Sequence, residues 1–128
     1  MKKDRLIIVK IQAYLLRIRR IYELIKDLDE DEILALDDSY ALTQFLINIY
    51  SLFERIHSEE IAKKQVDLGI RSLAACRNIS AHDYDSLNWS MIKQLCRKLL
   101  SEDTAKLLQE CYLIAEKEEA NGIDYTRV

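Results

Sequence analysis

The chain contains no proline and only two glycines in 128 residues. Average usage of about 5% Pro and 7% Gly would give roughly six and nine in this length. β-Sandwiches and barrels need a turn about every 8–12 residues, usually marked by Gly, Pro or Asn-Gly. Glycine-rich phosphate cradles need clustered glycines. Both classes are excluded, and a hydrophobic content of 49% argues against disorder. We therefore expect an all-α fold.

Apolar residues recur every three or four positions in several segments, which predicts amphipathic helices. A first helix over about 5–28 has the apolar seam Ile7, Ile11, Tyr14, Ile18, Ile21, Ile25 and Leu28. A second over about 40–58 has the seam Leu42, Leu46, Ile49, Phe53 and Ile56. A fourth begins near Asn88 and carries Trp89, Ile92, Leu95, Cys96 and Leu99.

The third helix has an irregular seam. It reads Ala62, Val66, Ile70, Leu73 and then Arg77, so that an arginine takes a position that the period reserves for an apolar residue. The polar stretch 58–64 before it leaves open whether the chain turns there. Cap- and turn-favouring side chains between 78 and 88 predict that the helix ends in that stretch.

The last part of the chain starts a new helix at Ser101 or continues as one helix kinked there. If a fifth helix begins at Ser101, it carries Leu107, Cys111, Ile114 and Ala115 and stops at Asn121-Gly122. We expect one domain over residues 1–120, an up-and-down bundle of four to five helices, followed by a tail over 121–128. The sequence shows no internal repeat and no linker.

Charge is unevenly distributed along a chain whose net charge is −3. Residues 1–26 carry eight basic side chains, whereas 27–38 carry seven acids and no base. In the acidic run, Asp37, Asp38 and Ser39 are expected to accept hydrogen bonds from the free N–H groups at a helix start. A polyanion would have to be met by a local basic patch, because the whole chain is mildly acidic.

Three cysteines without CxxC spacing and two histidines predict no metal site and no cofactor. Cys76, Cys96 and Cys111 are expected to be small buried apolar residues in a reducing compartment. The charged start of the chain and the short apolar run 6–9 predict neither a signal peptide nor a membrane span. The expected location is the cytoplasm.

The chemically richest segment is the string Arg77-Asn78-Ile79-Ser80-Ala81-His82-Asp83-Tyr84. A guanidinium offers a fixed fork of donors to a phosphate, and an imidazole can give or take a proton near neutral pH. Positions 77 and 82 lie about 140° apart on a continuous helix. A helix that ends between them or just after His82 would let the turn bring them to one side. Two copies across a twofold axis would supply a second histidine.

The pattern Arg-x4-His-x-Tyr, at the end of the third helix of a small helical chain, resembles the HEPN superfamily and most closely its HepT-like branch. This resemblance implies a homodimeric, metal-independent endoribonuclease toxin paired with a minimal nucleotidyltransferase antitoxin. It implies Arg77 as the phosphate-holding cation, His82 as the acid or base, and Asn78 and Tyr84 as supporting groups. It also makes Tyr84 a candidate for AMP attachment by the antitoxin.

Basic residues at helical spacing are candidates for further RNA contact. They are Lys10, Arg17 and Arg20 on the first helix, Lys64 and Arg71 on the third, and Lys93 and Arg97 on the fourth. His57 is expected to be solvated surface, and Trp89, Tyr14, Phe45 and Phe53 to belong to the core or a dimer interface.

Two other functions stay open: a non-catalytic adaptor that serves a nucleotidyltransferase, and a plain helical interaction module.

Overall fold

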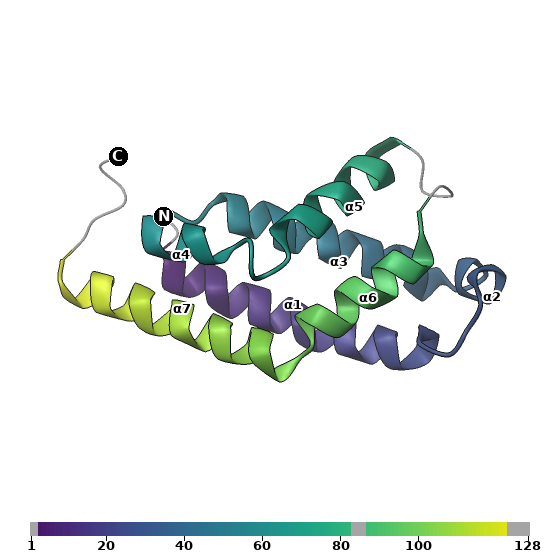
Figure 1. Cartoon of the computed structure of the whole chain (residues 1–128), viewed down its shortest axis with the longest axis horizontal. Helices are drawn as coiled ribbons and strands as arrows, with labels where there is room; N and C mark the ends of the chain where they lie inside the picture. Colours follow the sequence, from purple (N-terminus) through teal and green to yellow (C-terminus); the bar gives the residue numbers. More distant parts are fainter. Residues whose placement is uncertain (1–2, 83–86, 123–128) are drawn as a thin grey trace.

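The computed structural model describes residues 3–82 and 87–122, with the backbone alone for 79–82. These residues form seven helices and no strand (Figure 1): α1 (Asp4–Ile25), α2 (Glu30–Leu34), α3 (Asp37–Glu54), α4 (Glu59–Lys64), α5 (Ile70–His82), α6 (Trp89–Leu99) and α7 (Glu102–Ala120). The all-α bundle is confirmed, with the short helices α2 and α4 where the expectation was four to five helices in all. No described helix has the length and apolar character needed to cross a membrane. Of the expected tail, residues 123–128 lie outside the described part.

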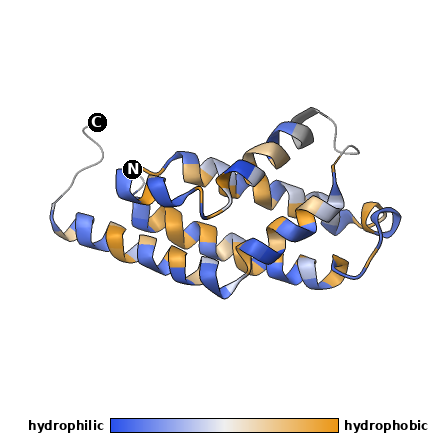
Figure 2. Cartoon of the chain, viewed as in Figure 1, coloured by the Kyte–Doolittle hydropathy of each residue, from blue (hydrophilic) through white to orange (hydrophobic). Residues whose placement is uncertain are grey.

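The core forms where the predicted apolar seams meet. Helix α3 packs against α1 on one side and α5 on the other, while α1 also contacts α6 and α7 (Figure 1). The seam predicted for the first helix is buried in α1 apart from half-buried Tyr14, and its last member, half-buried Leu28, lies beyond the end of α1 at Ile25. The α3 seam is buried up to Phe53, and all five predicted positions of α6 are buried. Figure 2 shows apolar and hydrophilic residues alternating along the helices, as expected for amphipathic helices that share one core.

The acidic run folds differently from the expectation. Asp29 caps α2 in a capping box with Glu32, in which each side chain accepts a bond from the other residue's backbone N–H. Helix α3 then begins at Asp37 with no side-chain bond at its N-cap, Leu36. The Ser39 hydroxyl donates to the Leu36 carbonyl. The expected helix start near Tyr40 was therefore wrong by three residues, and Asp37 and Asp38 lie in the first turn of α3, at the positive end of its dipole.

The predicted third helix is two helices, because the chain turns at Gly69. This glycine has a φ of +84°, in the left-handed region that side chains disfavour. Its N–H donates to the Val66 carbonyl and the Ile70 N–H donates to the Gln65 carbonyl, the bond pair of a Schellman motif. The first half of the predicted seam was therefore wrong. Ala62 and Val66 are exposed, and Ile61, Leu68, Leu73 and Cys76 are the buried residues of this segment.

Helices α6 and α7 are separate, which excludes a single kinked helix. Ser101 is the N-cap of α7, and its hydroxyl accepts from the Thr104 N–H at 3.2 Å. Asn88 caps α6 in the same way through the N–H of Met91. At the far end α7 stops at Asn121, and Gly122 follows with a φ of +79°. The side chains that the sequence marks as helix boundaries act as caps here.

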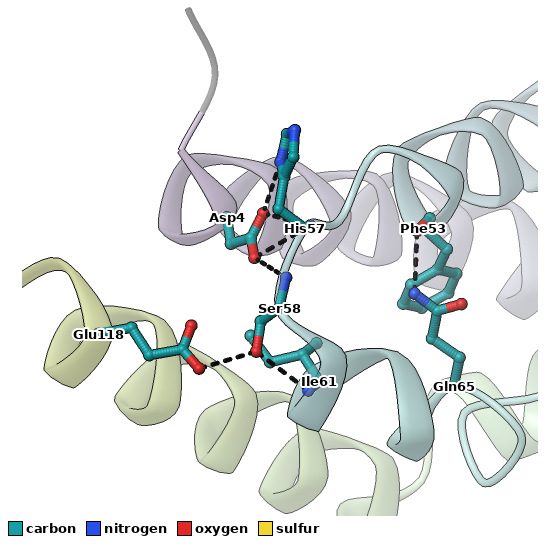
Figure 3. A network of polar contacts seen from close by, with 7 residues as sticks. All are labelled: Asp4, Phe53, His57, Ser58, Ile61, Gln65 and Glu118. Atoms are coloured by element: carbon teal, nitrogen blue, oxygen red, sulfur yellow. Dashed lines mark hydrogen bonds and ion pairs between the residues drawn. The ribbon is translucent and has the colours of Figure 1, made fainter. Parts of the chain in front are cut away.

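A buried carboxylate joins three parts of the bundle (Figure 3). Asp4, at the start of α1, is 1% exposed and accepts from the backbone N–H of His57 at 2.9 Å and of Ser58 at 2.8 Å. The Ser58 hydroxyl donates to Glu118 of α7 and accepts from the Ile61 N–H at the start of α4. The network fixes the link between α3 and α4, from which the chain leads into α5.

Replacing Asp4 by alanine is expected to lower the free energy of unfolding by about 2–4 kcal/mol. The change leaves two backbone N–H groups without an acceptor, one of them buried, and each such loss costs about 1–3 kcal/mol. Urea unfolding followed by circular dichroism measures the effect. The control is Asp27→Ala, an exposed acid, for which we expect a change within about 0.5 kcal/mol. Similar unfolding midpoints for the two variants would contradict this role of Asp4.

Candidate functional site

Helix α5 carries the first half of the motif on its exposed side. Arg77 and Asn78 are exposed, although the seam pattern predicted an apolar residue at 77. The helix buries Leu73 and Cys76 instead. Arg77 therefore lies next to the apolar face of α5 and is not part of it. The motif arginine is therefore accessible to a ligand.

Tyr50 of α3 positions the guanidinium of Arg77. The Cζ atom of Arg77 lies 5.3 Å from the centre of the Tyr50 ring, within the range of a cation–π contact. None of the ion pairs among the described residues involves Arg77. An aromatic face orients the planar group without using the N–H fork that would bind a phosphate. The sequence pattern gave no signal for Tyr50, because the contact depends on how α3 and α5 pack.

His82 is the last residue of α5, so the helix does not end between Arg77 and His82. Of the two arrangements considered from the sequence, only the one with a helix end just after His82 remains. Five residues on a regular helix separate the two positions by about 140° and about 7.5 Å along the axis. The side chain of His82 and the whole of Tyr84 lie outside the described residues. Their approach to Arg77 stays a prediction.

The predicted RNA-contact residues fall into two groups. Five are exposed: Lys10, Arg17, Arg20, Arg71 and Arg97. The other two have contacts within the fold, since Lys64 lies 3.8 Å from a Glu110 carboxylate oxygen and Lys93 donates to the Leu28 carbonyl at 2.6 Å. The expected common helix face of Lys64 and Arg71 was wrong, because the turn at Gly69 places them on α4 and α5.

None of the three cysteines is a candidate nucleophile. All are buried and free of disulfides. Burial raises the pKa of Cys96 to about 12 and the pKa of Cys111 to about 11. Both thiols are therefore protonated at neutral pH and unreactive. The expectation of small buried apolar residues is confirmed.

The four aromatic residues that were expected in the core or a dimer interface, and His57, make contacts within the bundle. Trp89 and Phe53 are in the core, and half-buried Tyr14 and Phe45 pack with their ring centres 5.6 Å apart. The His57 side chain is 39% exposed, and its Nδ1 lies 3.4 Å from Asp4 Oδ1. It is surface, as expected, but it also takes part in the network around Asp4 (Figure 3).

Comparison with known proteins adds one finding. The family model described as Ribonuclease HepT-like matches residues 8–111, a range that includes the whole string from Arg77 to Tyr84. No curated protein and no solved structure gives a significant match. The matched range begins within α1 and ends within α7, so it covers most of the bundle that holds the exposed Arg77. The chain belongs to the HepT-like ribonuclease family.

Proposed function

We propose that this protein is a metal-independent endoribonuclease toxin whose site combines Arg77 and His82 at a homodimer cleft. The observation that carries the proposal is the accessible Arg77 within a motif that lies inside the family match. Its guanidinium is oriented by Tyr50 and has no acid partner among the described ion pairs. Membership of a ribonuclease family supports RNA as the substrate.

The proposed reaction is an internal transesterification. One imidazole takes the proton of the ribose 2′-hydroxyl, and the 2′-oxygen attacks the neighbouring phosphorus. A second imidazole gives a proton to the 5′-oxygen as its bond to phosphorus breaks. Arg77 stabilises the negative charge that builds up on the phosphorane. The products are a 2′,3′-cyclic phosphate and a free 5′-hydroxyl, and no metal ion takes part in any step.

The geometry of α5 favours a site made from two copies. Positions 77 and 82 of one chain lie on different sides of a helix that runs through both. One chain also offers a single motif histidine, whereas the reaction uses a base and an acid. A twofold axis beside the ends of two α5 helices would supply both imidazoles and two guanidinium groups.

Control by a minimal nucleotidyltransferase antitoxin is part of the same proposal. Such a partner would join the Tyr84 oxygen to the α-phosphorus of ATP and release pyrophosphate. The resulting phosphodiester is an anion next to the motif, so it would compete with RNA for Arg77. Tyr84 is thus proposed as a regulatory position, with Asn78 as a polar neighbour of the arginine.

The test is RNA cleavage by the purified protein in the presence of EDTA. We expect cleavage to persist, to leave 2′,3′-cyclic phosphate ends detectable by mass spectrometry, and to come from a species with the mass of a dimer. Cleavage that stops in EDTA and returns with a divalent ion would refute the proposed chemistry. A stable complex with a nucleotidyltransferase, together with no RNA cleavage by the purified homodimer, would establish the adaptor function instead.

A further inference from the structure

A second polar site lies between α1 and α3, outside the motif. Helices α1 and α3 run antiparallel here, and the groove between them encloses about 480 Å³ of space open to solvent. Its lining residues are Lys10 and Tyr14 from α1, and Asn48, Ser51, Leu52 and Arg55 from α3. Five of these six carry a hydrogen-bonding group, so this groove is polar in a bundle with an apolar core.

The cations of this groove differ from those that are held in ion pairs with acids. Lys3, Arg5, Lys26 and Lys64 pair with glutamates. None of the described ion pairs involves Lys10 or Arg55, and both side chains are exposed. Two unneutralised cations beside one polar groove produce a local positive potential in a chain of net charge −3.

Arg17 extends this charge along α1. Its Cζ lies 5.4 Å from the centre of the Tyr14 ring and 5.9 Å from that of Phe45, so two aromatic rings hold the guanidinium in place. It is seven residues from Lys10, which corresponds to about 10.5 Å along the helix. The distance from Lys10 to Arg17 therefore exceeds the width of a single phosphate group, so the two cations would contact different phosphates.

Neutral donors complete the site. The Asn48 amide donates to the Tyr14 hydroxyl oxygen at 3.2 Å, which leaves the phenolic proton available to another acceptor. The hydroxyl of Ser51 is a further donor on the groove wall. Charged and neutral donors together match the oxygens of a phosphodiester.

We propose that this groove, lined by Lys10, Tyr14, Asn48, Ser51 and Arg55, binds a backbone phosphate of a single-stranded RNA. The inference rests on the proposed function and assigns to it a substrate-binding subsite remote from the cleavage motif. Helix α3 connects the two places, because Tyr50 supports Arg77 and the adjacent Ser51 lines the groove. A strand that crosses α3 would contact both.

The experiment measures binding without cleavage. A labelled single-stranded RNA of about 12 nucleotides, within the size that such sites cover, is titrated by fluorescence anisotropy against His82→Ala protein. In that background we expect the pair Lys10→Ala and Arg55→Ala to weaken binding by about tenfold or more. We also expect it to reduce the slope of log affinity against log salt by about 0.7, the value for one lost phosphate contact on a single strand.

The matched control removes two exposed lysines elsewhere, Lys63 on α4 and Lys106 on α7. This control variant changes the net charge by the same amount as the groove variant, and we expect its affinity for the RNA to fall by less than threefold. Equal losses in the two pairs, or an unchanged salt slope, would overturn the proposal. Inorganic phosphate or AMP that displaces the RNA at equal concentration would overturn it in favour of a small-anion site. Circular dichroism confirms that each variant is folded.

Cleavage kinetics separate this inference from the proposed function. With His82 restored, the groove variant should raise KM for the long RNA at unchanged kcat, and cleave a dinucleotide as wild type does. A fall in kcat on the dinucleotide would overturn the subsite, because a dinucleotide cannot span both places. If the wild-type protein cleaves no RNA, the proposed function fails while the anisotropy result still decides the groove.

Discussion

RNA cleavage by the His82→Ala variant is expected to be at least about 10⁴-fold slower than by the wild type. One general acid or base contributes about 10²- to 10⁴-fold, and in the proposed homodimer the change removes both the base and the acid. The measurement is the rate of formation of 2′,3′-cyclic phosphate ends at saturating RNA.

The matched control for this variant is His57→Ala. The backbone N–H groups of His57 and Ser58 still bond to Asp4 after this change, so the fold is retained. Its cleavage rate should stay within about twofold of wild type. A His82→Ala protein with full activity would remove the imidazole from the mechanism.

The Arg77→Ala variant is expected to lose at least about 10²- to 10³-fold in cleavage rate. This range is typical when one donor to a developing anion is removed, and the homodimer loses the guanidinium of both copies. The stability should change little, because an exposed cation–π contact such as that of Arg77 with Tyr50 contributes about 0.5–1 kcal/mol. Single-turnover cleavage, together with urea unfolding of the same sample, distinguishes the two effects.

Two further variants show what Arg77 contributes. Arg77→Lys keeps the charge but loses the planar fork, so it should recover only part of the rate. Lys106→Ala, an exposed cation of α7, should cleave as wild type does. An Arg77→Ala enzyme within a few-fold of wild type would show that the phosphorane is stabilised by another group.

The long helices were predictable because their seams depend on local periodicity alone. Apolar residues recur at helical spacing from Ile7 to Ile25 in α1 and from Trp89 to Leu99 in α6. A helix with a single apolar face packs that face against the core of a bundle. The caps at Ser101 and Asn88 were predictable for the same local reason, since each lies immediately before its helix.

The errors occurred where a short signal competed with a longer pattern. The seam through Ala62 and Val66 continued helical spacing past Gly69, although that glycine was one of only two in the chain. Helix α2 was not among the expected helices, although Asp29 and Glu32 have the spacing of a capping box. The glycine and the capping box are both visible in the sequence, but a search for periodic apolar residues does not detect either of them.

The sequence suggests the chemistry of the candidate site but not its surroundings. The motif string makes Arg77 and His82 candidates from sequence alone, and their roles stay a prediction. Tyr50 beneath the guanidinium and Arg55 in the α1–α3 groove could not be identified in that way, because each depends on how two helices pack side by side. The residue spacing within one helix does not show which side chains of a second helix it will contact.

The position of the motif arginine depends on Gly69, a residue that takes no part in the proposed reaction. A Cβ at this position would lie 3.4 Å from Leu95 Cδ1 on a backbone that side chains rarely adopt. The direction in which α5 leaves α4, and so the approach of Arg77 to Tyr50, is therefore set by a residue eight positions upstream that has no side chain. A substitution at Gly69 would therefore displace Arg77 from Tyr50 without altering any residue that is proposed to contact RNA.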